Sequence, residues 1–287
     1  MSCNKIFVCG ASGNVGLNLM KSLEKKGSMI KAGVRDPSKF KCNLKNVEPV
    51  KFDYKDKSTW DMALKGCDKI FMIALPMDMT PESYLGPLIE KCKEMKFKKI
   101  VFLSVVNPEK LQLFNVENLI KNCGINYGIL RPPFFMDNFS SGFMRQEVDK
   151  GCISSPAGQH AISFISCKDI GDCACEMLIT DKHNNQIIEI TGPAPLTFTQ
   201  ISQMLEKQLN KSVKYNLVSE SDFFNGAKKS GMPSSMVKFY ELLYEPIMMD
   251  KNAKVTKGVE QITGHKPMSF ECFLKEGNFN KPVGPSM

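Results

Sequence analysis

A glycine-rich turn near the N-terminus places the strongest constraint on the fold of this 287-residue chain. The turn spans residues 10–16 and reads GASGNVG, with glycine at its first, fourth and seventh positions. A short, mainly apolar segment at residues 5–9 precedes it and predicts a buried strand. The apolar residues at 15–26 recur with the spacing of one helix face. The sequence therefore predicts a strand, a tight turn and a helix in direct succession, which is the opening unit of a parallel sheet.

The chain repeats this alternation of apolar runs and amphipathic patterns as far as residue 131. A parallel sheet that is covered by helices on both faces produces such a rhythm. We therefore expect an α/β fold with a Rossmann-type, doubly wound parallel sheet. Further strands are predicted at residues 30–35, 47–53, 69–74, 99–104 and 126–130, and helices at 58–66 (capped by Ser58), 80–95 and 109–123.

The pattern changes after Arg131, where the segments become irregular and helices dominate. Asp169 is expected to cap a helix at 170–179, a capping box at 197–200 to open another, and residues 234–249 to form a third. We place a soft boundary near residue 140. A Rossmann domain at 1–140 would be followed by a smaller, mainly helical C-terminal lobe at 141–287, which partly rejoins the sheet and binds a substrate or partner.

The glycine-rich turn also predicts a ligand. Gly10 would make the tight turn, Gly13 would let backbone amides approach a pyrophosphate, and Gly16 would let helix and strand pack closely. The helix N-terminus offers unpaired N–H donors and the positive end of its dipole. A tight turn without a ligand is the alternative. We expect a dinucleotide on the whole turn, that is on Gly10, Ala11, Ser12, Gly13, Asn14, Val15 and Gly16.

Arg35 at the end of the second strand bears on the choice of dinucleotide. NAD-selective sites commonly place an acidic residue there, whereas an arginine accommodates the 2′-phosphate of NADP. Lys39 follows one helical turn later and could assist, although Asp36 stands beside Arg35. We expect NADP(H), with NAD(H) as the alternative.

Composition narrows the possible partners. The net charge is +8, but the 38 basic residues include only three arginines, and the lysines are interleaved with acids. Arginine is the usual residue for reading bases, so we do not expect the protein to bind nucleic acid. No apolar run approaches the roughly 20 residues that span a bilayer, and we expect no membrane contact.

The eleven cysteines are scattered and form no C-x-x-C motif, which favours reduced thiols and no metal site. Reduced thiols are typical of the cytoplasm, where we expect the protein, with nuclear entry left open.

With these motifs in place, the chain resembles the NmrA-like family of atypical short-chain dehydrogenase/reductases. The resemblance covers nearly the whole length and rests on the order of many short motifs. They are the turn at 10–16, Val34-Arg35-Asp36-Pro37, Asp53-Tyr54, the segments 99–104 and 129–132 with Asn138, 163–165 with 168–170, 190–193, and 262–264 with Pro267.

The resemblance implies further residues along the cofactor. Asp53 and Tyr54 would sit near the adenine. Ala74, Leu75 and Pro76 would lie along the ribose and pyrophosphate. Ser104 would approach the nicotinamide end together with the loop after the sixth strand, which contains Pro133, Phe134, Phe135 and Met136. All these positions follow strands, where ligands of parallel sheets bind, although Leu75 and Phe134 could equally be packing residues.

The catalytic residues remain unknown from the sequence. None of the six tyrosines is followed by lysine four positions later, so the Tyr-x-x-x-Lys pair of classical relatives is missing. Many NmrA-like relatives keep a lysine three residues before a Val-Glu pair. Here Leu113 holds that position before Val116 and Glu117, and Lys110 is a nearby alternative on the same expected helix.

Two functions remain open. The first is an NAD(P)H-dependent oxidoreductase that reduces a quinone-like or similarly electrophilic small molecule, for which water can supply protons. Apolar and aromatic side chains at 134–136 and Phe139 would line its acceptor site, unless they pack in the core. The second is a non-catalytic NADP(H) sensor that binds a regulatory protein partner. We favour the enzyme.

Overall fold

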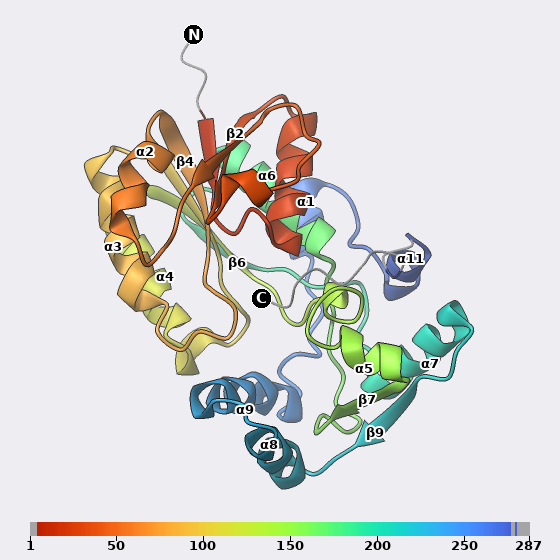
Figure 1. The fold of residues 1–287 in the computed structure, drawn as a ribbon. Coiled ribbons are helices and arrows are strands. Elements are labelled where there is room, and N and C mark those ends of the chain that lie inside the picture. Colours follow the sequence, from red (N-terminus) through yellow and green to blue (C-terminus); the bar gives the residue numbers. More distant parts are fainter. Residues whose placement is uncertain (1–4, 277–278, 280–287) are drawn as a thin grey trace.

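The computed structural model describes residues 5–276 and residue 279 (Figure 1). Within them, seven strands form one sheet in the order β3-β2-β1-β4-β5-β6-β8, and every neighbouring pair is parallel. The predicted Rossmann-type parallel sheet is confirmed. Its strands are β1 (Lys5–Val8), β2 (Met29–Val34), β3 (Val47–Lys51), β4 (Cys67–Ile73), β5 (Lys99–Leu103), β6 (Asn126–Arg131) and β8 (Gln186–Glu189).

Helices cover both faces of this sheet (Figure 1). One face packs against α1 (Asn14–Lys25) and α6 (Cys167–Ile179), and the other against α2 (Trp60–Leu64), α3 (Glu82–Glu94) and α4 (Leu113–Asn122). The predicted apolar face of α1 is the buried one. Short 3-10 turns lie in the loops: η1 (Pro37–Lys39), η2 (Lys57–Thr59), η3 (Pro108–Lys110) and η4 (Met136–Asn138).

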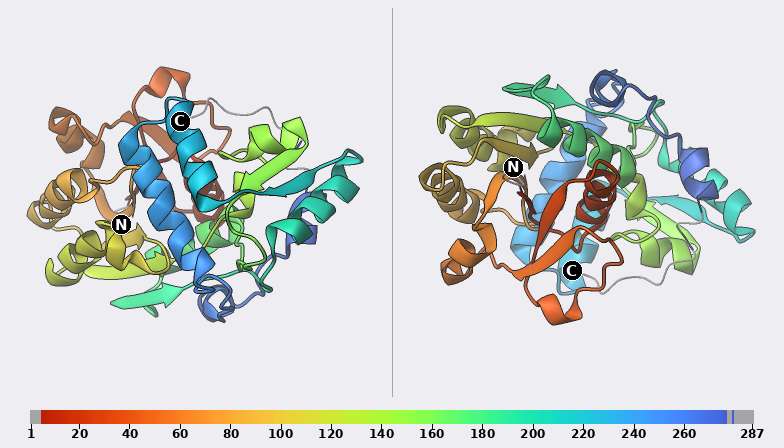
Figure 2. Two further views of the ribbon diagram at one scale, coloured as in Figure 1. Left: turned by 90° about the horizontal axis from the view of Figure 1, so that it is seen from below. Right: turned by 90° about the horizontal axis from the view of Figure 1, so that it is seen from above.

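A smaller lobe with its own aromatic core lies beyond the carboxyl ends of the strands (Figure 1). Its central rings, such as Phe139 and Phe164, meet edge to face with centroids 5.6 Å apart. Helices α8 and α9 lie side by side when the molecule is seen from below (Figure 2, left). The lobe contains α5 (Arg145–Lys150), β7 (Cys152–Ser155), α7 (Phe198–Leu209), β9 (Lys214–Leu217), α8 (Glu220–Lys229), α9 (Ser234–Met248) and α11 (Phe270–Lys275).

The chain after residue 140 also contributes to the sheet layer. Strand β8 forms an edge of the sheet beside β6, and α6 lies on the face that α1 covers. The short helix α10 (Gly258–Thr263) packs against α6. The lobe is therefore connected to the sheet by several crossings of the chain.

Three local expectations are wrong. Asp56, rather than Ser58, caps the turn before α2, because its carboxylate accepts from the Ser58 N–H. Helix α6 begins earlier than expected, since Ser166 in extended backbone caps it and Asp169 lies in its first turn. The helix expected at 109–123 is divided, because Leu111 has extended backbone with φ −106° and ψ 145°. The capping box at 197–200 is confirmed.

The described cysteines, ten in number, are all free thiols, as the scattered spacing predicts. Of the helices in the described ranges, none is both long and apolar enough to cross a bilayer.

Candidate functional site

The order of the strands reverses between β1 and β4. From β1 the chain runs outward through β2 to β3, and it then returns to β4 and continues through β5 to β6. The loops that follow β1 and β4 therefore diverge, which leaves a crevice at the carboxyl edge of a doubly wound sheet. Because all strands are parallel, the segments 10–16, 35–39, 53–54, 74–76, 104 and 133–136 are all brought to this one edge.

The glycine-rich turn has the conformation that its glycines predict. Gly10 has a φ of +63°, and a Cβ there would lie 2.8 Å from Ile73 Cγ2 on β4. A Cβ on Gly16 would lie only 2.3 Å from the carbonyl oxygen of Gly10. The Gly13 N–H donates to that same oxygen at 3.0 Å and closes the turn. Larger residues would force the turn and α1 away from the sheet.

The N-terminus of α1 has features of an anion-binding site. Gly13 is its N-cap, and within the described chain no side chain caps the helix or places an acid in its first turn. First-turn amides of a helix have no partner inside the helix, and they bind phosphate groups readily. The cradle that Cβ atoms at Gly10 and Gly16 would fill, together with these amides, fits a pyrophosphate.

Arg35 and Lys39 lie exposed directly after β2. Asp36, which stands between them, forms contacts with Ser38 and Lys39 and no ion pair with Arg35. Its carboxylate accepts from the side chain and amide of Ser38 at 2.6 and 3.0 Å, and lies 3.4 Å from Lys39 Nζ. The Ser38 hydroxyl lowers the pKa of Asp36, so this acid stays ionised and paired. Arg35 forms no ion pair with any described residue, and its guanidinium is available for a phosphate.

The residues after β3 and β4 meet in one cleft of about 680 Å³. Tyr54 is buried, and its hydroxyl donates to the Ile73 carbonyl at 2.7 Å. Asp53 is half-buried and accepts from the Lys55 amide at 2.9 Å, and Ala74 precedes the cleft. The cleft is lined by Tyr54, Lys55, Lys57, the segment 75–80, Ser83, Tyr84 and Ser235 of α9.

Ser104 follows β5 at the centre of this edge. Only 2 % of the residue is exposed, and its N–H donates to the Leu130 carbonyl at 2.9 Å. Its hydroxyl, by contrast, has no hydrogen-bond partner among the described residues. A buried polar group without a partner costs about 1–3 kcal/mol, and such a group at a ligand edge indicates that the ligand supplies the partner.

The loop after β6 differs from the expected apolar wall. Phe134 and Met136 are 4 % and 1 % exposed, and they pack in the core of the lobe with Phe139. Their main chain pairs with Ile165, whose N–H donates to Phe134 O while its carbonyl accepts from Met136 N. The side chains of Phe134 and Met136 therefore stabilise the lobe, and these two residues can offer a ligand only backbone atoms. Pro133 is also buried, and Phe135 is half-buried against the sheet core.

Two aromatic residues that the sequence did not single out lie beside this loop. Phe143 is 44 % exposed, and its ring centroid lies 6.4 Å from that of Phe134. It also contacts Tyr240 of α9, at 5.7 Å between centroids. The two rings come from segments nearly a hundred residues apart, so no local sequence pattern could have paired them.

The candidate proton donor Lys110 is not on the expected helix. It lies in η3, whereas Leu113 begins α4, so the two positions do not share a helix face. Leu113 packs against the sheet core. Glu117 of α4 is fully buried and accepts from Arg131 Nε and Nη2 at 3.0 and 2.5 Å. This ion pair joins α4 to the end of β6.

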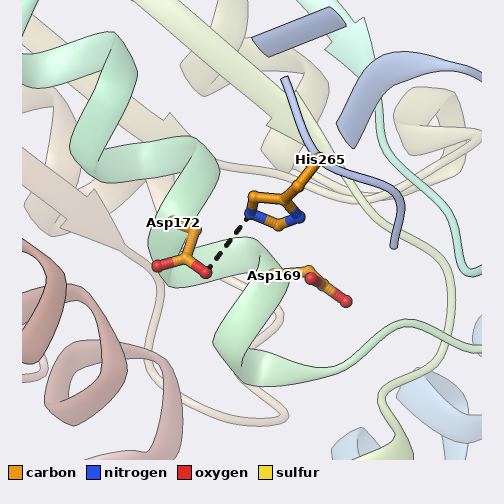
Figure 3. Close-up of side chains that lie close together, drawn as sticks. All are labelled: Asp169, Asp172 and His265. Carbon is orange, nitrogen blue, oxygen red and sulfur yellow. Dashed lines mark ion pairs between the residues drawn. The ribbon is translucent and has the colours of Figure 1, made fainter. Parts of the chain in front are cut away.

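A further polar group lies beside α6, where Asp169 and Asp172 of this helix meet His265 from the segment after α10 (Figure 3). His265 Nε2 lies 3.6 Å from Asp172 Oδ2. Asp169 accepts from the Met268 amide at 2.9 Å, and its burial raises the pKa of its carboxyl. Asp172 accepts from Ser22 of α1. These contacts fasten the segment after α10 onto α6 and α1, which accounts for the group as structural.

A parallel sheet with this strand order, a glycine-rich turn at the switch point and an uncapped helix N-terminus define a Rossmann protein of the dinucleotide-binding class. The chain belongs to the NmrA-like family, whose model matches residues 2–274. The resemblance drawn from the motifs is thereby confirmed.

Individual relatives span nearly the whole chain. Prestalk A differentiation protein A from Dictyostelium discoideum is 43% identical over 94% of this chain and 91% of its own length. An NAD(P)H azoreductase from Xenophilus azovorans is 26% identical over 94% of this chain and 96% of its own. The crystal structure of the NADPH-dependent quinone oxidoreductase QOR2 from Escherichia coli, complexed with NADPH, has a TM-score of 0.80 at 24% identity, covering 94% of this chain and 99% of its own. That structural likeness concerns the fold.

Proposed function

We propose that this protein binds NADP(H) and transfers hydride to a quinone-like or similarly electrophilic small molecule. The observation that carries the proposal is the buried hydroxyl of Ser104, which has no partner among the described residues and lies on the same sheet edge as the uncapped α1. The azoreductase and quinone oxidoreductase activities of relatives support the same reaction class.

Each part of the dinucleotide has matching residues. The amides of the glycine-rich turn would hold the pyrophosphate, and Arg35 and Lys39 the 2′-phosphate. The cleft at Tyr54, Leu75 and Pro76 would receive the adenosine end. Ser104 and the backbone of 133–136 would hold the nicotinamide end. A reduced nicotinamide bound there supplies the hydride, which is chemistry that no side chain of the protein offers.

The side chains contribute orientation and a hydrogen bond. The Ser104 hydroxyl is free to donate to an oxygen that gains negative charge during reduction, in a buried position where such a bond is strong. Phe143 and Tyr240 offer ring surfaces for a planar acceptor. No side chain is assigned as proton donor, and water can supply protons to a reduced quinone.

A two-part experiment tests the proposal. Calorimetry first measures the dissociation constants of NADPH and NADH, and NADPH oxidation is then followed with one-ring and two-ring quinones. We expect tighter binding of NADPH than of NADH, and steady turnover with at least one quinone. If the protein binds NADPH but shows no turnover with any acceptor, the proposal that it is an enzyme is refuted.

One observation favours a second candidate. The Tyr-x-x-x-Lys pair is missing, and Leu113 holds the position of the family lysine. A protein that binds NADPH without turnover would be an NADP(H) sensor, which then requires a protein partner. The same experiment separates the two functions, because binding is measured apart from turnover.

A further inference from the structure

Asn14 and Ser141 meet at the mouth of the glycine-rich turn. Asn14 is the first residue of α1, and Ser141 belongs to the loop between η4 and α5 that leads into the lobe. Asn14 Nδ2 donates to Ser141 Oγ at 2.9 Å, although 127 positions separate the two residues. The lobe is thus tied directly to the segment that fits a pyrophosphate.

The loop that carries Ser141 is tightly built. The amides of three consecutive residues, 140–142, all donate to the Asp137 carbonyl, at 3.2, 3.0 and 2.9 Å. Arg145 Nη1 donates to the carbonyl of Ser140 at 2.7 Å. The position of Ser141 is therefore set by its own loop before any ligand arrives.

The loop is also anchored to the helix layer beside α1. Asp137 Oδ2 accepts from the Cys167 amide at 2.8 Å, and Cys167 is the first residue of α6. Helix α6 packs along the length of α1. Asp137 therefore contacts both the Ser141 loop and the start of α6, and the packing of α6 against α1 keeps this loop beside α1.

Donors converge at this point, and no acid faces them from the first turn of α1. The Ser141 oxygen accepts from Asn14, and its own hydroxyl proton has no acceptor within residues 5–276. We propose that Asn14 and Ser141 form a clasp over the pyrophosphate, in which the Ser141 hydroxyl donates to a phosphate oxygen. The lobe thereby becomes part of the cofactor site, an inference that rests on the proposed dinucleotide function.

The test compares ligands with and without a pyrophosphate. Calorimetry on the full chain gives dissociation constants for NADPH, NADH and adenosine 2′-phosphate, which lacks the pyrophosphate. For Ser141→Ala we expect NADPH and NADH to bind about tenfold more weakly, the scale of a hydrogen bond to a charged group. Adenosine 2′-phosphate should bind as it does to wild type. Ser141→Thr keeps the hydroxyl and should stay within about threefold of wild type for every ligand.

Coupling between the two residues supplies an independent readout. The dissociation constant of NADPH for the double variant Asn14→Ala, Ser141→Ala should be no larger than that of the single variant with the greater loss. The two losses should not add, because the clasp acts as one unit. Ser230→Ala at the C-cap of α8, which removes a hydroxyl that donates to the Ala227 carbonyl, is the matched control and should leave NADPH affinity unchanged.

Two results would overturn the clasp. Unchanged NADPH affinity in Ser141→Ala would show that the hydroxyl contacts no ligand. A parallel loss for adenosine 2′-phosphate, or a loss accompanied by a lower unfolding temperature, would show that the loop only supports the fold. If wild type binds neither NADPH nor NADH, the proposed function itself fails, and that outcome is distinct from both.

Discussion

Lys110 and Glu245 form an ion pair across the boundary between the sheet and the lobe. Lys110 lies in η3 after β5, and Glu245 lies near the end of α9. The hydrogen bond from Lys110 lowers the pKa of Glu245, so the carboxylate stays charged at neutral pH. The one lysine near the expected family position is thus engaged by the lobe.

This pairing predicts that Lys110 is not a proton donor. We expect Lys110→Met to keep quinone reduction within about tenfold of wild type, below the usual effect of losing a general acid. Glu245→Gln is the control, because it breaks the same ion pair and leaves the lysine in place. A fall in kcat of a hundredfold or more in Lys110→Met alone, with NADPH affinity and unfolding temperature intact, would make Lys110 catalytic.

Gly13→Asp should abolish cofactor binding without unfolding the protein. Gly13 is an N-cap with φ −82°, a conformation and position that suit aspartate well. The new carboxylate would accept from the amides that otherwise bind phosphate, and its charge would repel the pyrophosphate. Calorimetry should detect no NADPH binding, while thermal unfolding stays at or above wild type. Gly226→Asp, which adds the same side chain in open space on α8, should bind normally.

Arg35→Ala should separate the two dinucleotides. Loss of a charge-assisted hydrogen bond to the 2′-phosphate should weaken NADPH by about 1–3 kcal/mol and barely affect NADH. Lys41→Ala removes an exposed positive charge from the same surface and serves as the control. Equal losses for both cofactors would show that Arg35 does not read the 2′-phosphate.

Ser104→Ala should lower the activity of the protein without lowering its stability. Removing a buried hydroxyl without a partner should leave the free energy of unfolding unchanged or raise it by about 1 kcal/mol. The kcat for quinone reduction should fall by about a hundredfold, because one donor to the developing charge is lost.

Ser163→Ala is the contrasting variant. Ser163 is also fully buried, but its hydroxyl donates to the Ala253 carbonyl at 2.9 Å. This variant should lose about 1 kcal/mol of stability and keep its kcat. If Ser104→Ala behaves in the same way, its hydroxyl has a structural role.

Arg131→Met should destabilise the fold strongly. Glu117 is fully buried and depends on Arg131 for both of its side-chain hydrogen bonds described above. Leaving this carboxylate buried and unpaired should cost about 3–5 kcal/mol in urea unfolding. The double variant Glu117→Leu, Arg131→Met should recover most of the loss, since neither charge remains. A double variant as unstable as the single one would contradict this explanation.

Local sequence patterns predicted much of the fold. The glycine spacing at 10–16 requires close approach of backbone segments, and the structure shows Gly10 and Gly16 in contacts that exclude a Cβ. The apolar period of α1 and the buried runs of β4, β5 and β6 predicted their elements, because burial imposes its period on the local sequence. The ends of elements were less predictable, as at α6, where Ser166 instead of Asp169 provides the cap.

The candidate site also contains some features that local sequence patterns predict and others that depend on tertiary contacts. The amino-acid sequence by itself determined the strand–turn–helix unit, the parallel sheet and the basic residue after β2, since each depends on neighbours a few positions apart. Only the tertiary structure decided that Phe134 and Met136 face the lobe core, that Lys110 pairs with Glu245, and that Ser141 reaches Asn14. Those contacts join segments far apart in the chain, and their formation depends on how the lobe packs against the sheet, which no local period encodes.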